Sequence, residues 1–183
     1  MTAESAAEIP TGYTAGTWDI DPVHSHIGFT ARHLMVSKVR GNFTKFEGQI
    51  ITADDPLQSS GTATIDATSF ETNHEQRNSD VRSEGFLDAA NHPQITYRST
   101  AVHPKGDGEF TVDGELTIKG VTRPIELTVE VNGFGPDPFG GTRAGFSATG
   151  EINRHDYGVS GGGAMVSDKI QLTIEAEASL KKD

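Results

Sequence analysis

Ser160 is the residue whose neighbours most resemble those of a catalytic nucleophile. The segment 158–162 reads G-V-S-G-G, which matches the G-x-S-x-G pattern of a nucleophile elbow. That pattern works on a sharp turn from a strand into a helix, which aims the hydroxyl at a base. Here another glycine follows and no helical pattern succeeds it. We therefore predict a Gly-rich hairpin loop and no enzyme activity; a serine hydrolase that uses Ser160 is the less favoured alternative.

Two histidines suggest a second kind of chemistry, metal binding. His24 and His26 are two residues apart, so in a strand both imidazoles would share one face, a spacing that suits zinc or copper. His33, Asp21 and Glu47 are conceivable third ligands. No HxxxH or HExxH motif accompanies the pair, and such pairs also arise wherever a strand shows a polar face to solvent. We expect no functional metal site.

A polar segment between Asn73 and Glu84 interrupts the strand pattern of the chain. Asn73 is a good helix N-cap, Gln76 stands three residues later, and Gly85 would end the helix. The pattern predicts one short helix at about Asn73–Glu84, followed by Phe86 and Leu87 packed into the core. Because the segment has few apolar residues, we expect it across the sheet surface or at a barrel mouth.

These candidate residues must be positioned by strands, because most of the remaining chain alternates apolar and polar residues with a period of two. About eight such strands, each with one apolar face, predict an all-β antiparallel sheet that either stacks as a sandwich or closes as a barrel. The small residues among the large ones allow two interiors, a packed core or an open lumen. The large apolar residues of these faces are Ile27, Phe29, Phe43, Ile65, Leu116, Ile118, Leu127 and Phe146.

The amino-acid composition of the chain limits the kinds of partner that it can bind. The 183 residues include 15 Lys and Arg against 26 Asp and Glu, a net charge of −11, which disfavours binding to nucleic acid or to an anionic membrane surface. The absence of cysteine excludes disulfides and thiolate metal sites. No apolar run approaches about 18 residues, so we expect no membrane insertion. Residues 1–16 contain no Lys or Arg and read as a flexible leader rather than an export signal, which predicts a cytoplasmic protein.

Four blocks of the sequence, in order, resemble the YceI-like family of polyisoprenoid-binding proteins. They are WDIDPVHSHIGFTARHLMVSKVRGNFTKFEGQI, TSFETNHEQRNSDVRSEGFLDAANHPQITYRST, GELTIKGVTRPIELTVEVNGFG and DPFGGTRAGFSATGEINRHDYGV. The resemblance implies that residues 17–183 form an extended eight-stranded antiparallel lipocalin-like barrel with the short helix beside it. It also implies a homodimer, no catalysis and no cofactor, with an apolar tunnel for an isoprenoid-chain lipid of the quinone or polyprenyl type.

The resemblance does not transfer a sharp binding site, so we predict one from the inward strand positions. The eight large apolar residues named above would form the tunnel wall. Tyr97, Arg154 and Tyr157 would lie at the mouth and contact a polar head group. The alternative is a stress-response or structural module with a packed barrel and a protein partner.

Overall fold

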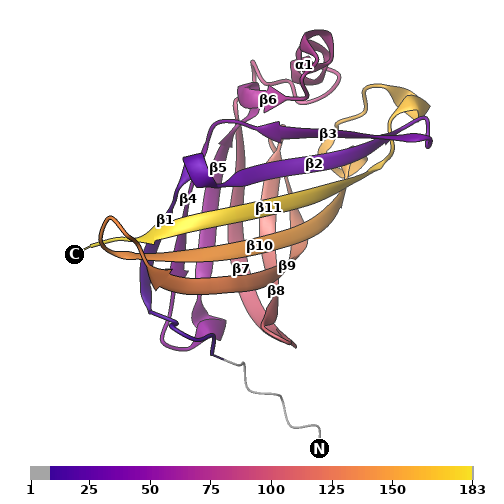
Figure 1. The fold of residues 1–183 in the computed structure, drawn as a ribbon. Coiled ribbons are helices and arrows are strands. Elements are labelled where there is room, and N and C mark those ends of the chain that lie inside the picture. The colour runs from indigo at the N-terminus through magenta and orange to yellow at the C-terminus, as the bar shows by residue number, and fades with distance from the viewer. Residues whose placement is uncertain (1–8, 183) are drawn as a thin grey trace, which may run out of the picture.

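The computed structural model describes residues 9–182, which form one antiparallel sheet wrapped into a barrel (Figure 1). The strands are β1 (Gly16–Ile20), β2 (His26–His33), β3 (Ser37–Phe43), β4 (Phe46–Thr52), β5 (Ser60–Asp66), β6 (Phe70–Glu71), β7 (Gln94–Gly106), β8 (Glu109–Ile118), β9 (Val121–Pro136), β10 (Thr142–Asn153) and β11 (Lys169–Leu180). They are joined by one α-helix, α1 (Glu75–Arg82), and by 3-10 turns at Pro22–His24, Pro56–Gln58, Ala67–Ser69, Arg154–Tyr157 and Gly163–Met165.

Eight strands close the ring. The order β1-β4-β5-β7-β8-β9-β10-β11 returns to its start because β11 pairs with β1, and β2, β3 and β6 continue the sheet beyond β11. This confirms the predicted closed eight-stranded antiparallel barrel. The period-two pattern explains it, since each strand turns its apolar side chains inward and its polar ones outward.

One edge of β11 is shared between two strands. Its residues 171–175 pair with β2, and its residues 178–180 pair with β1. Between β1 and β2 the chain makes the 3-10 turn Pro22–His24. Pro22, at its start, has no backbone N–H that needs a partner. Asp21 caps the turn, because its carboxylate accepts from the backbone N–H of Val23 at 3.0 Å. Segment 16–33 is therefore one strand broken in the middle.

Helix α1 is shorter than the predicted Asn73–Glu84, and its cap is a different residue. Asn73 has φ +61°, a left-handed conformation that Asn tolerates better than most residues, so the chain reverses before the helix starts. His74 is the N-cap, and its Nδ1 accepts from the backbone N–H of Arg77 at 3.1 Å. The buried Asn78 anchors the helix, because its amide oxygen accepts from the N–H of Thr72 at 2.8 Å.

Helix α1 lies at one mouth of the barrel beside β6 (Figure 1), as its polar composition predicts. No helix among residues 9–182 has the length and apolar character needed to cross a bilayer.

The opposite end of the barrel is built around Trp18. Its side chain is fully buried, its indole N–H donates to Thr52 Oγ1 at 2.8 Å, and its ring meets Phe134 edge-on at 5.5 Å. Tyr13, which we expected in a flexible leader over 1–16, contacts Phe134 as well, and its hydroxyl donates to the carbonyl of Ala53 at 2.5 Å. Tyr13 is therefore held against this end; residues 1–8 lie outside the described part.

Trp18→Ala should lower the free energy of unfolding by about 3–5 kcal/mol, because it removes a large buried side chain where β1 joins the ring. Thr52→Val, which leaves the indole N–H without its acceptor, should cost about 1–3 kcal/mol. Urea unfolding followed by circular dichroism measures both, since Trp18 is the single tryptophan. The control is Ile51→Ala at a half-exposed site of β4. A loss for Trp18→Ala no larger than the control's would contradict this account.

Candidate functional site

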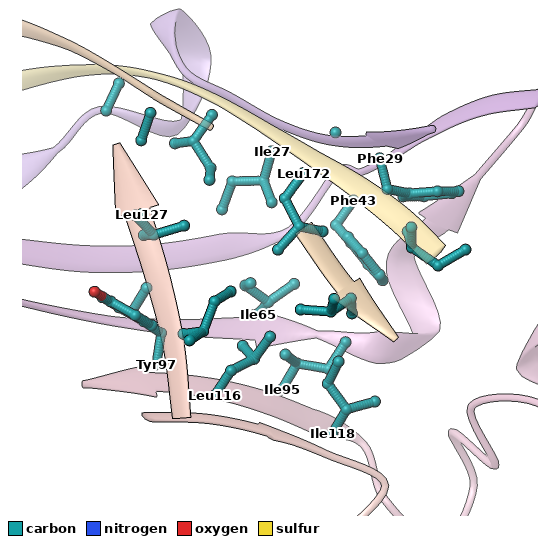
Figure 2. A pocket seen from close by; sticks show the side chains of 18 of the residues that line it. Ile27, Phe29, Phe43, Ile65, Ile95, Tyr97, Leu116, Ile118, Leu127 and Leu172 are labelled. Carbon is teal, nitrogen blue, oxygen red and sulfur yellow. The ribbon is translucent and has the colours of Figure 1, made fainter. Parts of the chain in front are cut away.

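The barrel is hollow. Its interior holds a cavity of about 1050 Å³, at the upper end of the range of small-molecule sites. Figure 2 shows apolar side chains from several strands converging on it. Leu172 and Ile174 of β11 point inward yet keep some accessible surface, because the cavity lies beside them. The structure therefore has the open lumen rather than the packed core.

All eleven side chains predicted for the site line this one cavity. They are Ile27, Phe29, Phe43, Ile65, Leu116, Ile118, Leu127, Phe146, Tyr97, Arg154 and Tyr157. Contact with a ligand remains a prediction for each of them. The alternation of the strands also pointed to Leu172, which the predicted set omitted. Phe86, expected to pack into the core, borders the cavity as well, whereas nothing local marked Phe70 as a lining residue.

Three aromatic rings form the part of the wall near α1. Phe29 of β2 stacks on Phe70 of β6 with ring centres 4.9 Å apart, and Phe43 of β3 contacts both rings at 5.8–5.9 Å. Gly41 permits this packing, because a Cβ there would lie 2.3 Å from the Phe29 ring and 2.8 Å from the carbonyl oxygen of Glu71. The extension of the sheet by β2, β3 and β6 thus supplies an aromatic wall that the ring alone lacks.

Two of the residues that line the apolar cavity, Tyr97 and Tyr157, carry phenol hydroxyls. The hydroxyls of Tyr97 and Tyr157 are buried without a hydrogen-bond partner in the protein. Burial raises the pKa of each to about 12, so both remain protonated donors at neutral pH. A buried hydroxyl without a partner is costly, so a small movement of either ring that brought its hydroxyl to an acceptor on a ligand would be favourable.

Arg154 is not available in this way. Its five N–H groups donate to five backbone carbonyls, which uses every donor of a guanidinium. These carbonyls belong to Val159, Gly161, Gly163, Val166 and Ser167, at 2.7–3.1 Å. Arg154 therefore holds the loop 158–167 in place, and the prediction of a head-group contact has no free donor to support it.

The same loop carries Ser160, which is exposed. The segment after it is a three-residue 3-10 turn, Gly163–Met165, and not the helix that a nucleophile elbow requires. Within residues 9–182 no hydrogen bond links Ser160 to a histidine or a carboxylate. The loop therefore has none of the elements that would activate this serine.

Comparison with known proteins agrees with the fold. A profile of the YceI-like domain matches residues 18–178. The chain belongs to the YceI-like family. Protein YceI of Escherichia coli O157:H7 is 37% identical to this YceI-like protein over 166 residues, which cover 90% of this chain and 86% of the relative.

Two solved structures extend the comparison. The crystal structure of BcnA from Burkholderia cenocepacia has a TM-score of 0.79 at 27% identity and covers 86% of this chain and 98% of its own. A polyisoprenoid binding domain from Saccharophagus degradans, implicated in plant cell wall breakdown, has a TM-score of 0.67 at 16% identity. The match covers 92% of this chain and 100% of that domain. At 16% identity, the similarity to the Saccharophagus degradans domain shows a shared fold.

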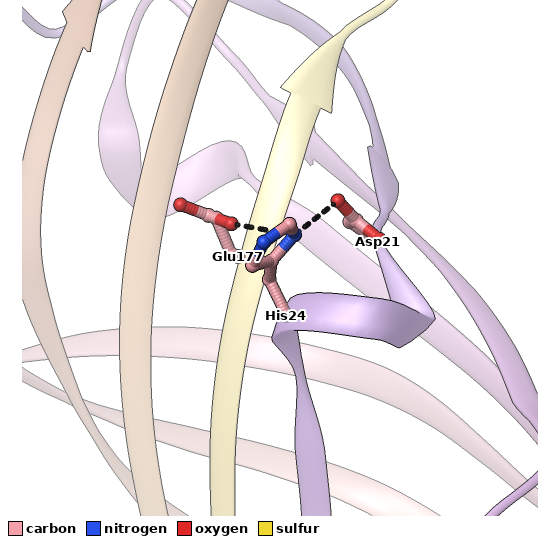
Figure 3. A group of neighbouring side chains, drawn as sticks. All are labelled: Asp21, His24 and Glu177. Atoms are coloured by element: carbon pink, nitrogen blue, oxygen red, sulfur yellow. Dashed lines mark hydrogen bonds and ion pairs between the residues drawn. The ribbon is translucent and has the colours of Figure 1, made fainter. Parts of the chain in front are cut away.

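The paired histidines of this YceI-like protein do not act together. His26 begins β2, whereas His24 lies in the 3-10 turn before it and belongs to another group. Figure 3 shows His24 between Asp21 and Glu177: its Nδ1 is 2.8 Å from Asp21 Oδ2 and 3.4 Å from Glu177 Oε2. The sequence pattern missed this arrangement because it treated His24 as part of a continuous strand.

Asp21, His24 and Glu177 offer three metal-ligand atoms within 4.8 Å of one another, but a cation already faces them. The Arg143 guanidinium lies 3.0 Å from Asp21 and 3.3 Å from Glu177, and a second bond at 2.6 Å joins it to Asp137. A divalent ion would have to displace this guanidinium. We call Asp21, His24, Glu177 and Arg143 the seam cluster, because it spans the break between β1 and β2 and the facing part of β11.

Hydrogen bonds within the seam cluster shift its ionisation. The bond to His24, followed by that to Arg143, lowers the pKa of Asp21 to about 2. The Asp21 carboxylate, through its hydrogen bond and its charge, raises the pKa of His24 above 6.5. The cluster is therefore held best when both carboxylates are ionised and His24 is protonated.

The seam cluster should give the protein a pH-dependent stability. A lowered pKa means that Asp21 stabilises the fold above its ordinary pKa of 3.8, and that this stabilisation is lost as the pH falls toward 2. A raised pKa means that His24 stabilises the fold below pH 6.5, and that this is lost as the pH rises through the raised value. The amount by which the thermal unfolding midpoint of the wild type exceeds that of His24→Gln should therefore be largest in mildly acidic buffer and disappear in alkaline buffer.

Thermal unfolding over a pH series measures that difference. His26→Gln, which removes an imidazole from outside the seam cluster, is the matched control. An equal pH dependence in the two variants would show that the cluster contributes nothing specific.

Proposed function

We propose that this YceI-like protein binds a long-chain lipid of the isoprenoid class in its barrel and carries or stores it without chemical change. The observation that carries the proposal is the apolar cavity of about 1050 Å³ inside a closed barrel. The polyisoprenoid binding domain of Saccharophagus degradans, which shares the fold, supports the choice of ligand class. The loop around Ser160, which lacks the parts of a nucleophile elbow, supports a binding role rather than catalysis.

The energetics fit such a ligand. Each buried CH₂ group contributes about 0.8 kcal/mol, so a long apolar chain binds tightly without a charged anchor. An apolar wall discriminates poorly between chains, since one methylene group changes binding by only about 1–3 kcal/mol. Selectivity then depends on the few polar atoms present. The hydroxyl donors of Tyr97 and Tyr157 suit carbonyl or hydroxyl oxygens, as in a quinone or a polyprenyl alcohol.

The hollow interior also separates this proposal from its rival, a structural module with a packed barrel. In a packed core the inward side chains would fill the volume that the cavity occupies here. The proposal retains the homodimer implied by the family resemblance, to be tested by light scattering on the purified protein.

Protein purified without detergent should contain a lipid, because an apolar chain leaves such a cavity for water only at great cost. Organic extraction and mass spectrometry should find isoprenoid species, close to one per subunit. Fatty acids in that position would overturn the isoprenoid class. Protein that yields no lipid and fails to bind menaquinone or a polyprenyl phosphate at micromolar concentration would overturn the proposal.

A bulky substitution in the cavity wall should reduce the amount of bound lipid while changing the stability of the fold only modestly. Leu172→Trp fills part of the cavity, so we expect it to reduce bound lipid while costing no more than about 1–3 kcal/mol of stability. Gln171→Trp, the next residue of β11 and exposed on the outer face, is the matched control and should keep the lipid. Quantified extraction and urea unfolding measure the two effects. Unchanged lipid content in Leu172→Trp would contradict the assignment of the cavity.

A further inference from the structure

The turn between β2 and β3 ends in large apolar side chains that face solvent. Leu34, Met35 and Val36 are 55%, 67% and 87% exposed, and Met165 of the adjacent loop is 54% exposed. The backbone N–H of Leu34 donates to the carbonyl of Met165 at 2.9 Å, which brings the two segments together. We call these four residues the apolar tip. Exposed apolar residues gathered at one place mark an interaction site.

The backbone of the apolar tip is unfavourable for the residues that occupy it. Leu34 and Met35 have φ angles of +53° and +57°, in the left-handed region that glycine and asparagine adopt at much lower cost. Folding alone would therefore favour small polar residues at both positions. The presence of two large apolar side chains there indicates that they serve a contact outside the chain.

Two exposed cations flank the apolar tip, because Arg32 of β2 pairs with Lys38 of β3 at the base of the turn. Between Asp21 and Glu47 the chain has no acidic residue, although it carries 26 of them in total. The same stretch contains four basic residues, of which Arg32 and Lys38 lie beside the turn, Arg40 lies further along β3, and Lys45 follows the far end of that strand. Charges on a surface are screened beyond about 8–10 Å at physiological ionic strength, so Arg32 and Lys38 act on the tip more strongly than the net charge of −11 does.

The apolar tip also lies at the opening of the cavity. Arg32, His33 and Lys38 beside the turn line the cavity, and so does Met165. In Figure 1 the β2–β3 hairpin projects from the barrel on the side away from the C-terminus. A surface that docks there would meet the mouth of the cavity.

We propose that the apolar tip and its flanking cations dock on a bilayer that contains anionic lipids. Apolar side chains that enter the headgroup region, with Lys and Arg at the level of the phosphates, match such a surface in polarity and in charge. A symmetric contact with a second copy fits less well, because it would place the two basic stretches against each other. The role of this contact in loading the cavity rests on the proposed function; the docking itself does not.

Sedimentation with vesicles tests the docking. The full chain should bind vesicles of equal parts phosphatidylcholine and phosphatidylglycerol, bind phosphatidylcholine alone more weakly, and lose affinity as salt is added. Leu34→Asn/Met35→Gly should lower the partition coefficient by about tenfold or more, since it removes two apolar side chains. It also relieves the φ angles, so a misfolded hairpin cannot explain the loss. Arg32→Gln/Lys38→Gln, which neutralises the two cations beside the turn, should lower it about fivefold per cation.

Two control variants remove charged or apolar side chains like those of the tip from other parts of the surface. Lys181→Gln/Lys182→Gln makes the same charge change at the C-terminal end, and Phe139→Ser removes an apolar side chain that is 96% exposed in the β9–β10 turn. Both should bind vesicles like the wild type. Failure of the wild type to bind, or equal losses in tip and control variants, would overturn the proposal. A change of subunit number in Leu34→Asn/Met35→Gly would overturn it in favour of a second copy.

Menaquinone delivered from detergent separates this proposal from the proposed function. Leu34 and Met35 are outside the cavity lining, so their variant should bind menaquinone like the wild type. Menaquinone binding without vesicle binding would overturn the docking alone. Vesicle binding without menaquinone or polyprenyl phosphate binding would overturn the cavity function alone.

Discussion

The sharing of one edge of β11 between β1 and β2 is the constraint on which the barrel depends. An edge strand in water exposes unpaired N–H and C=O groups, and closing the ring removes that exposure. The break at Pro22–His24 makes the sharing possible: on one side β1 pairs onward with β4 and closes the ring, and on the other β2 pairs with β3. Glu177 faces the break, and its carbonyl accepts from the N–H of Asp21 at 2.8 Å and from Ser25 Oγ at 3.2 Å.

At the same break, charged side chains lie on the outside of the barrel and apolar side chains lie on the inside. The seam cluster stays on the outer surface, where its charges remain hydrated, and the inward side of β11, with Ile170, Leu172, Ile174 and Ala176, is entirely apolar. The interior remains open because small residues lie among the large ones on the inner faces; Ala63, Ala148 and Ala176 all border the cavity. An eight-stranded ring is just wide enough to be filled by large side chains, so small ones leave room for a ligand.

Local patterns predicted the strands and the inward set, because alternation along a strand reports directly which face is buried. They fitted a sandwich as well as a barrel, and only the resemblance to the YceI-like family implied the closed ring. Whether the interior is packed or hollow depends on the summed volume of eight strands, which no local pattern contains. The role of Arg154 was also beyond the sequence: its five acceptors come from a loop that folds back after it. His24 was assigned to a strand because Pro22 was not recognised as the start of a turn, and Glu177 is far from it in sequence.

The two ends of the barrel differ in a way that gives a bound lipid a direction. At one end Trp18, Phe134 and Phe146 pack together and Tyr13 covers Phe134, so this end presents aromatic carbon to the cavity. At the other end the cavity is bordered by the polar helix α1 and by the cations beside the apolar tip. On the proposed function, an apolar chain gains most by entering with its tail toward Trp18. Its polar end then lies toward the mouth beside α1, which on the proposed docking is the end that faces the bilayer, so the lipid need not turn around during transfer.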